Sequence, residues 1–348
     1  MNDLFNSKLA EAENIEHACM ALLSEVERRT FLKRAGRFGG AVLLGTYLGF
    51  LASCGREQAA RVTRTAPVPS PPPSNAPAPL PGADLAVATG ADPSEITRKA
   101  LDALGGMGRF VSRGDVVVVK PNASFTGKPE EGTSTHPEVL SQVVSMCREA
   151  GASRVIVMDH CLRGTPQACL TGNGIGVAAQ AAGAEIIAYA AHDSGHGMAA
   201  AIPEGLSMRQ VNIYPEVLSA DVVITVPKAK HHGSTGLSLG MKNFIGVTSN
   251  MSNIHNYDLN QAIADLNTLV KPKLSVVDAT IVLLENGPGG PGKTAALNTV
   301  IASGDVVAAD SYACTLFGVT AKQVPYIVHG GRAGLGEVDY NKLNIRRV

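Results

Sequence analysis

The segment Val116-Val117-Val118-Val119-Lys120-Pro121-Asn122 contains the pattern that indicates the fold class. Four consecutive β-branched residues are typical of a strand buried on both faces, and the polar residues after them mark its end. Short apolar runs of the same kind recur along the chain. They are Leu85 to Thr89, residues 155–158, Val222 to Val226, residues 274–277 and residues 300–302.

Amphipathic segments separate these apolar runs. Residues 137–150 and 259–270 place apolar side chains at helical spacing, with Pro137 at a first helical position and Gly151 at a terminating one. The alternation of strands and helices predicts an α/β domain, with a mainly parallel sheet and helices on both faces.

Polar side chains follow four of the predicted strands. In open parallel sheets ligands gather at the carboxyl ends of the strands, so we expect these side chains to face one cleft. The alternative is that they are polar only because loops are polar. The residues are Lys120 and Asn122, then Asp159 and His160, then Lys228, Lys230, His231 and His232, and finally Asp278.

These residue types suggest how such a cleft would work. Lysines can hold an anionic group, and histidines can transfer protons or bind metal near neutral pH. The expected catalytic residues are His232, Lys242 and His136. The expected substrate-binding residues are Lys120, Asn122, Lys228, Lys230, Asp278 and Asn286. The expected metal ligands are His255, His231 and Asp159, and a divalent metal is the cofactor that they would suit.

Two of these interpretations have a simpler alternative. His136 precedes a predicted helix whose free N–H groups could receive a carboxylate or phosphate, but His136 or Thr135 could equally cap that helix. Asp305 and Asp310 lie near another helix start, where capping is favoured over ligand binding.

Several motifs together resemble the uncharacterised family known as domain of unknown function 362 (DUF362), over roughly residues 85–336. They are Lys120-Pro121-Asn122, Thr135-His136-Pro137-Glu138, Val226-Pro227-Lys228-Ala229-Lys230 with His232, Met241-Lys242-Asn243-Phe244-Ile245-Gly246, Ile263-Ala264-Asp265-Leu266-Asn267, Val277-Asp278 and Asn286-Gly287-Pro288. The chain departs from the pattern at His231, where relatives have Thr, and it lacks the ferredoxin-like cysteine clusters of some relatives. We therefore do not expect an iron–sulfur cluster.

A more distant resemblance concerns the layout of residues 222–255, which is similar to that of the nickel-pincer lactate racemase family. The resemblance implies that Lys242 occupies the position of a covalent cofactor tether and that His255 occupies a metal-binding position. The alternative is that Lys242 binds an anion.

The segment from Gly287 to Thr294 matches the phosphate-loop expression letter for letter. A phosphate loop offers successive backbone N–H groups and opens a helix, whereas Pro288 and Pro291 each remove a donor and a strand follows. We interpret the segment as a lid over the cleft.

Four cysteines of the domain have two kinds of expected role. Cys161 and Cys169 are expected to form a disulfide, although Cys161 could instead bind metal with Asp159 and His160. Cys147 and Cys314 are expected in the core.

The amino-terminal segment resembles an export signal. Arg28-Arg29-Thr30-Phe31-Leu32-Lys33 is similar to the twin-arginine motif, an uncharged stretch spans residues 39–52, and Leu51-Ala52-Ser53-Cys54 resembles a lipoprotein box. We predict a signal at residues 1–53, a Pro-rich linker at 54–82 and the α/β domain at 83–348. Alternatives are a single membrane anchor, or a Cys54 that merely follows an ordinary cleavage site.

Composition limits the range of functions. Lys plus Arg and Asp plus Glu both number 30, aromatic residues make up 4%, and Trp is absent, so nucleic-acid binding is not expected.

We expect a protein on the periplasmic side of a bacterial membrane, exported by the twin-arginine translocase and lipid-anchored at Cys54. The leading hypothesis is a metal- or cofactor-dependent enzyme of a small anionic metabolite. The alternatives are a non-catalytic lipoprotein that binds a ligand or metal, and a redox partner.

Overall fold

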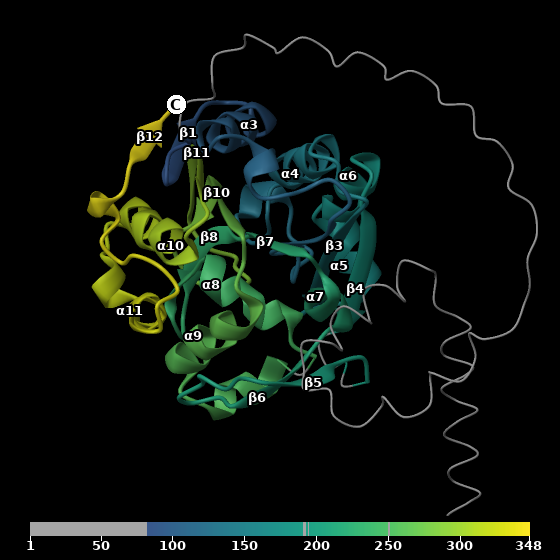
Figure 1. The fold of residues 1–348 in the computed structure, drawn as a ribbon, viewed down its shortest axis with the longest axis vertical. Helices are drawn as coiled ribbons and strands as arrows, with labels where there is room; N and C mark the ends of the chain where they lie inside the picture. Colours follow the sequence, from purple (N-terminus) through teal and green to yellow (C-terminus); the bar gives the residue numbers. More distant parts are fainter. Residues whose placement is uncertain (1–81, 191–192, 194, 250) are drawn as a thin grey trace, which may run out of the picture. The chain divides into compact units, whose positions relative to one another are not determined.

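Strand β2 (Val116–Pro121) pairs in parallel with β7 (Val222–Val226) on one side and with β3 (Arg154–Cys161) on the other. The computed structural model describes residues 82–190, 193, 195–249 and 251–348, and Figure 1 shows how their elements are arranged. The predicted export signal, Cys54 and residues 54–81 of the predicted linker lie outside the described residues.

The main sheet within these described ranges has ten strands. Its order is β12-β1-β11-β10-β7-β2-β3-β4, with β8 paired to β10 and β9 paired to β8. The remaining strands are β1 (Leu85–Thr89), β4 (Glu185–Ala190), β8 (Lys228–His232), β9 (Gly236–Ser238), β10 (Leu274–Leu283), β11 (Thr294–Ser303) and β12 (Ile345–Arg347), and a separate hairpin holds β5 (Met198–Ala201) and β6 (Gln210–Ile213).

The pairings from β10 through β7, β2 and β3 to β4 are all parallel, whereas β11 is antiparallel to both β10 and β1. The prediction of an α/β domain with a mainly parallel sheet is confirmed. The sequence pattern did not reveal the antiparallel strand, because side-chain alternation carries no information on strand direction.

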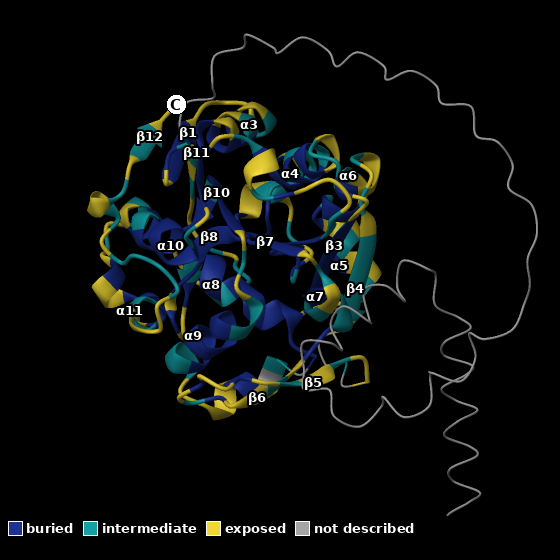
Figure 2. Cartoon of the chain, in the orientation of Figure 1, coloured by how far each residue is buried: buried dark blue, intermediate teal, exposed yellow. Residues whose placement is uncertain are grey.

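Helices cover both faces of the sheet, as predicted. They are α3 (Pro93–Ala103), α4 (Pro137–Glu149), α5 (Pro166–Gly172), α6 (Ile175–Ala181), α7 (Pro215–Ser219), α8 (Gly240–Asn243), α9 (Leu259–Val270), α10 (Val306–Cys314) and α11 (Pro325–Arg332). Val117 and Val119 pack into one core with α3, α4 and α6, while Val118 packs into a second core with α9, α10 and α11. Figure 2 shows the buried strands between these layers.

The predicted helix boundaries hold where a local signal fixes them. Helix α9 spans the predicted residues, and its first turn is capped by Asp258. Helix α4 begins at Pro137, and the chain turns away at Gly151, whose φ of 94° is in the left-handed region that favours glycine. Across the described part of the chain, no helix is long and apolar enough to cross a membrane.

Candidate functional site

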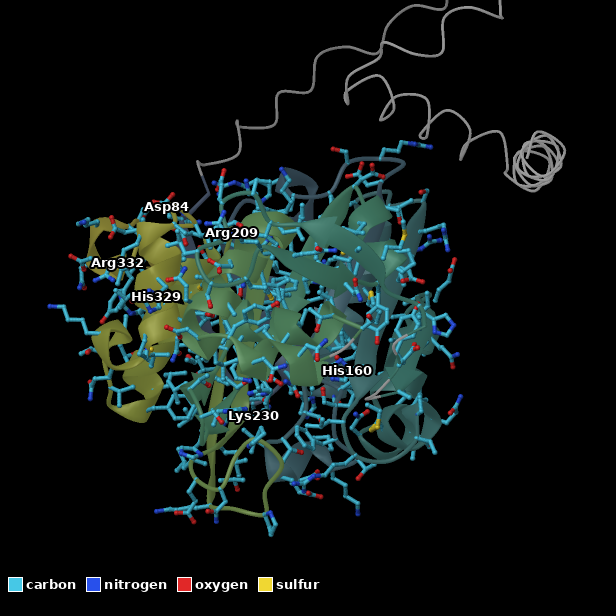
Figure 3. All side chains as sticks on the ribbon, turned by 90° about the horizontal axis from the view of Figure 1, so that it is seen from below. Asp84, His160, Arg209, Lys230, His329 and Arg332 are labelled. Atoms are coloured by element: carbon cyan, nitrogen blue, oxygen red, sulfur yellow. A yellow bond between two sulfur atoms is a disulfide. The ribbon has the colours of Figure 1, made fainter. Side chains whose placement is uncertain are left out.

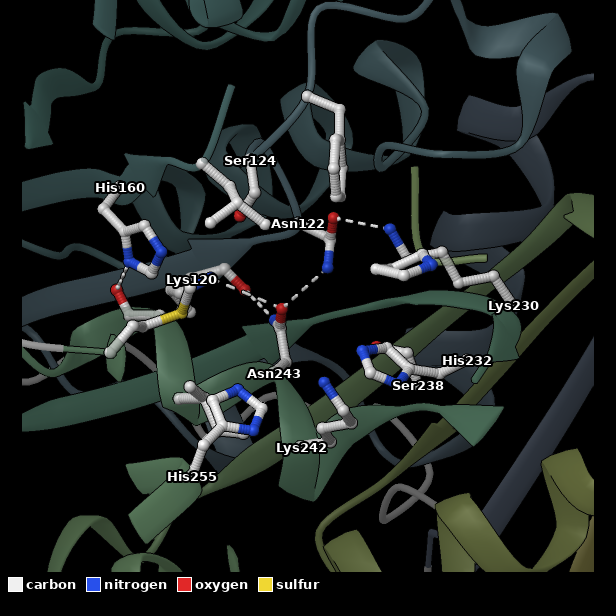
Figure 4. Close-up of a pocket in the computed structure, with 16 residues that line it drawn as sticks. Lys120, Asn122, Ser124, His160, Lys230, His232, Ser238, Lys242, Asn243 and His255 are labelled. Carbon is white, nitrogen blue, oxygen red and sulfur yellow. Dashed lines mark hydrogen bonds between the residues drawn. The ribbon is translucent and has the colours of Figure 1, made fainter. Parts of the chain in front are cut away.

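A pocket of about 240 Å³ lies where β2, β3 and β8 end. Figure 4 shows its polar lining and Figure 3 shows two of these residues, His160 and Lys230, within the body of the domain. The polar side chains are Lys120, Asn122, Ser124, His160, Lys230, His232, Ser238, Lys242, Asn243 and His255. The lining contains three lysines and three histidines but no carboxylate.

Lys120 forms the one ion pair that a lysine of the pocket makes within the described residues. Its Nζ lies 2.8 Å from Oδ1 of Asp159, and both side chains are buried. Burial lowers the pKa of Lys120, and the charge of Asp159 opposes that shift. The carboxylate of Asp159 also accepts hydrogen bonds from the backbone N–H groups of Ala123 (2.6 Å) and His160 (2.8 Å), so it is fully engaged.

The backbone of Gly246 approaches this ion pair closely. A Cβ atom at this position would lie 2.6 Å from both Oδ1 of Asp159 and Cε of Lys120. Only glycine therefore allows the 3-10 turn Phe244–Val247 to close over the pair.

Asn243 joins the ends of two strands. Its Oδ1 accepts from Nζ of Lys120 at 3.3 Å and lies 3.5 Å from Nδ2 of Asn122, while its Nδ2 donates to the carbonyl oxygen of Lys120 at 2.9 Å. A further bond from Nδ2 reaches Oγ1 of Thr225 at 3.1 Å. The network fixes Asn122 and Asn243 as one rigid polar wall.

Lys230 has neutral partners. Its Nζ donates to Oδ1 of Asn122 at 3.1 Å and to the carbonyl oxygen of Thr133, and it lies 4.6 Å from the centroid of the Phe125 ring. Burial lowers the pKa of Lys230 well below its ordinary value, and the charge of Lys242 adds to this shift. The ammonium form of Lys230 is therefore electrostatically disfavoured until a negative charge enters the pocket.

Lys242 is held by the short helix α8. The carboxylate of Asp310 accepts hydrogen bonds from the backbone N–H groups of Gly240 (2.7 Å) and Met241 (2.9 Å), which fixes the first turn of α8. Burial and the charge of Lys120 lower the pKa of Lys242 to about 8. Lys242 thus exists in both protonation states near neutral pH.

His232 presents an N–H group to the pocket. Its Nδ1 accepts a hydrogen bond from the backbone N–H of Ser234 at 3.2 Å, and burial together with nearby lysines lowers its pKa to about 3. The neutral ring therefore carries its proton on Nε2, which suits contact with an anion.

The structure brings together six of the predicted site residues. They are Lys120, Asn122, Lys230, His232, Lys242 and His255, and His255 is the most exposed of them. The prediction did not include Ser124, His160, Ser238 and Asn243 among the substrate-binding or catalytic residues. Asn243 follows Lys242 in a motif, and His160 follows a predicted strand, so both had a signal in the sequence.

Two predicted substrate-binding residues and one predicted catalytic residue have structural roles instead. Lys228 and Asp278 form a fully buried ion pair of 2.8 Å. Nδ1 of His136 accepts a hydrogen bond from the backbone N–H of Glu138 at 3.3 Å. His136 therefore caps the start of α4, which was the alternative to a catalytic role. Asn286 is exposed in a turn with a φ of 53° and does not line the pocket.

The predicted metal ligands do not meet. Nδ1 of His231 accepts from the backbone N–H of Gly287 at 3.1 Å, Asp159 is paired with Lys120, and only His255 lines the pocket. In the ranges that the structure covers, no group of three or more His, Cys, Asp or Glu side chains is placed to hold a metal ion. The three predicted ligands thus have different surroundings in this structure, and their role in metal binding stays a prediction.

The cysteines behave as expected. Cys161 and Cys169 form a disulfide with Cα atoms 5.9 Å apart, so the alternative in which Cys161 binds metal does not apply. Cys147 and Cys314 are free and buried, and burial raises the pKa of both thiols to about 12. Asp305 caps α10, whereas Asp310 lies inside that helix.

The segment from Gly287 to Thr294 leads into strand β11, so it lacks the helix that a phosphate loop requires. The sequence predicted that this segment forms a lid over the cleft, and its residue Pro288 does line the pocket.

Comparison with known proteins identifies related chains. The chain is 28% identical over 248 residues to the thylakoid-associated protein sll1697 of Synechocystis sp. (strain ATCC 27184 / PCC 6803 / Kazusa), covering 68% of this chain and 74% of that protein. Among solved structures, the lactate racemase apoprotein from Thermoanaerobacterium thermosaccharolyticum is similar at a TM-score of 0.42 and 12% identity. A protein from Thermotoga maritima is similar at a TM-score of 0.39 and 14% identity.

These two structures overlap this chain only in part. The matches cover 68% and 66% of this chain but only 57% and 60% of the respective solved chains. The family model described as domain of unknown function (DUF362) matches residues 117–315, which contain the strands, the lysines and the histidines of the pocket. The chain therefore belongs to the DUF362 family.

Proposed function

We propose that the pocket binds a small anionic metabolite and that Lys242 exchanges a proton with it. The observation that carries the proposal is the charge of the lining: Lys120, Lys230 and Lys242 share one pocket, and among the described residues only Lys120 has a carboxylate partner. At 4 Å, an opposite charge stabilises an ammonium by about 4 kcal/mol at the effective dielectric constant of such sites. A carboxylate or phosphate group would thus offset the burial of Lys230 and Lys242.

The walls of the pocket favour a ligand with a carbon skeleton over a bare inorganic ion. Phe125, Leu162, Ile245 and Met251 contribute apolar surface between the polar groups. Ligand sites commonly combine such apolar walls with a few convergent polar groups. The volume of about 240 Å³ suits a metabolite of a few carbon atoms.

Lys242 is the group best suited to proton transfer. General acid–base catalysis works best when the pKa lies near the working pH, and burial brings the pKa of Lys242 to about 8. His232 supports an anion through its Nε2–H group, because the low pKa of this ring keeps it neutral. Together they supply a base and a hydrogen-bond donor on one side of the pocket (Figure 4).

Calorimetric titration with acetate, butyrate and propyl phosphate tests the binding. We expect the Lys242→Met and Lys230→Met variants each to weaken binding by about ten-fold or more, since a charge-assisted contact is worth about 1.5–3 kcal/mol. Lys322→Met changes an exposed lysine outside the pocket and is the matched control. Unchanged binding in both pocket variants would overturn the proposal.

Solvent deuterium distinguishes an enzyme from a carrier. If Lys242 exchanges protons with the ligand, NMR in deuterated water should show deuterium entering a carbon position of the bound metabolite, and Lys242→Met should abolish it. Binding without exchange would overturn proton transfer between Lys242 and a carbon atom of the ligand, as expected of a ligand-binding protein.

The intact mass of protein isolated from its host tests whether Lys242 carries a covalent group. Lys242 and His255 line one pocket, so the residues that the lactate racemase layout would use for a tether and a metal do lie together. An added mass located on Lys242 would show that this residue holds a covalent cofactor, and it would overturn the role of its free amine in proton transfer.

We further propose that the protein is exported and lipid-anchored. Arg28-Arg29 and the lipoprotein box ending at Cys54 support this, as does the disulfide between Cys161 and Cys169, because disulfides persist in oxidising compartments. The Synechocystis relative is named for an association with thylakoids. Fractionation of cells that produce an Arg28→Lys, Arg29→Lys variant, and mass spectrometry of a Cys54→Ala variant, test export and lipidation separately.

A further inference from the structure

His160 is a buried histidine that lines the pocket and takes no part in the proposed proton transfer. It is 2% exposed at the end of β3, and its Nδ1 lies 3.1 Å from the carbonyl oxygen of Gly246. A carbonyl oxygen only accepts hydrogen bonds, so Nδ1 carries a proton. Burial lowers the pKa of His160, and the charge of Asp159 opposes this shift only in part, so the ring is neutral and Nε2 keeps its lone pair.

That lone pair has no partner within the described residues. Nε2 is buried and receives no hydrogen bond, although almost all buried polar atoms are paired. His160 lines the pocket, and Figure 4 shows it at one end of the lining residues with Lys230 and His232 at the opposite end. One end of the pocket therefore holds hydrogen-bond donors, and the other holds the unpaired acceptor Nε2 of His160.

The charge of the pocket decides which donor would meet this acceptor. The ammonium of Lys242, which predominates below about pH 8, would repel a metal ion or an ammonium group. A hydroxyl group donates a hydrogen bond without carrying a charge, and it is small enough to share the pocket with an anionic group. It thus fits both the acceptor and the electrostatics around it.

We propose that the ligand is a hydroxylated anion, whose carboxylate or phosphate lies at Lys230 and Lys242 and whose hydroxyl donates to Nε2 of His160. This inference rests on the proposed function, since it names the substrate class of the same pocket. It assigns His160 the role of selecting hydroxylated anions over their deoxy counterparts.

Calorimetry with two matched pairs of ligands tests the selection. The pairs are 3-hydroxybutyrate with butyrate, and glycerol 3-phosphate with propyl phosphate. We expect the wild-type protein to bind the hydroxylated member of at least one pair about 3- to 10-fold more tightly, the range that one hydrogen bond supplies.

Variants of two histidines test whether His160 causes the preference for hydroxylated ligands. In His160→Asn the amide nitrogen can still donate to Gly246, but no acceptor reaches the position of Nε2, so the preference should vanish while the deoxy ligand binds as before. His329→Asn is the control, because His329 is in α11 and does not line the pocket (Figure 3).

The outcomes separate the two proposals. Equal affinity for both members of each pair, or a preference that survives in His160→Asn, overturns the role of His160 and leaves anion binding intact. No binding of any of the four compounds overturns the proposed function, and this inference with it. An independent readout uses ¹⁵N-histidine NMR of the wild-type protein, in which the Nε2 resonance of His160 should move with the hydroxylated ligand and not with its deoxy partner.

Discussion

The Nζ atom of Lys120 lies 2.8 Å from Oδ1 of Asp159, and both side chains are buried. Because Asp159 also accepts two backbone hydrogen bonds, its charge is committed to this pair. Lys230 and Lys242 consequently face the pocket without a carboxylate of their own in the described part of the chain. Anion binding should therefore alter the protonation of these two lysines more than that of Lys120.

Anion affinity should fall as the pH rises through about 8. The pKa of Lys242 in the free protein is about 8, so the ammonium that attracts the ligand is present below this pH and is lost above it. Because the bound anion raises the pKa of Lys242, binding near and above pH 8 should take up protons. Calorimetry in buffers of different ionisation enthalpy measures both effects.

The Lys242→Met variant supplies the control for this pH dependence. Methionine does not titrate, so the part of the pH dependence centred near pH 8 should disappear. If that part persists in the variant, another group is responsible and the role of Lys242 is wrong.

The buried pair of Lys228 and Asp278 should matter for stability. Lys228→Met leaves the carboxylate of Asp278 buried without its cation, which should lower the free energy of unfolding by about 3–5 kcal/mol. The double variant Lys228→Met, Asp278→Asn removes both charges and should recover part of this loss. Urea unfolding at neutral pH measures the difference, and a double variant less stable than the single one would contradict the expectation.

Asp278 also predicts the direction of acid unfolding. Burial opposes its ionisation, but the charge of Lys228 and hydrogen bonds from Thr280 and His136 hold its pKa below the ordinary value. A depressed pKa gives stability that is present above the unfolded-state pKa and is lost as the pH falls through the folded-state value. The Asp278→Asn variant should therefore lose less stability than the wild type on acidification below about pH 4.

Asp310 should act on the pocket through α8. Both of its carboxylate oxygens accept backbone hydrogen bonds, and Asp310→Asn would replace one acceptor by a donor, which should cost about 1–3 kcal/mol. We also expect weaker anion binding, because the turn that carries Lys242 loses an anchor. Asp339→Asn, at an exposed cap, should change stability by less than about 0.5 kcal/mol. Wild-type binding by a destabilised Asp310→Asn variant would show that this carboxylate supports the fold alone.

The disulfide should stabilise the segment beside the pocket. Cys161 lies between His160 and Leu162, which both line the pocket, and it closes a loop with Cys169 at a sequence separation of 8. Replacing both cysteines by serine should lower the free energy of unfolding by about 2–3 kcal/mol on the loop-closure model, and it should weaken anion binding. Reductant should reproduce both effects in the wild type and leave the double variant unchanged.

The layers of the fold follow from local patterns in the sequence. The run Val116 to Val119 must be buried on both faces, and the side chains of Val117 and Val118 do enter different cores. Pro137 and Gly151 delimited α4, since their backbone preferences act locally. The strand-end rule also located the pocket, because parallel strands bring their carboxyl ends to one edge of a sheet.

The partner of each polar side chain, in contrast, depends on tertiary contacts. Lys228 and Lys230 are two residues apart in β8, yet Lys228 meets Asp278 and Lys230 meets Asn122. His231 and His232 are adjacent, but the alternation of a strand turns the first towards Gly287 and the second into the pocket. These pairings join residues far apart in the chain, so they depend on strand order and register, which local sequence does not encode.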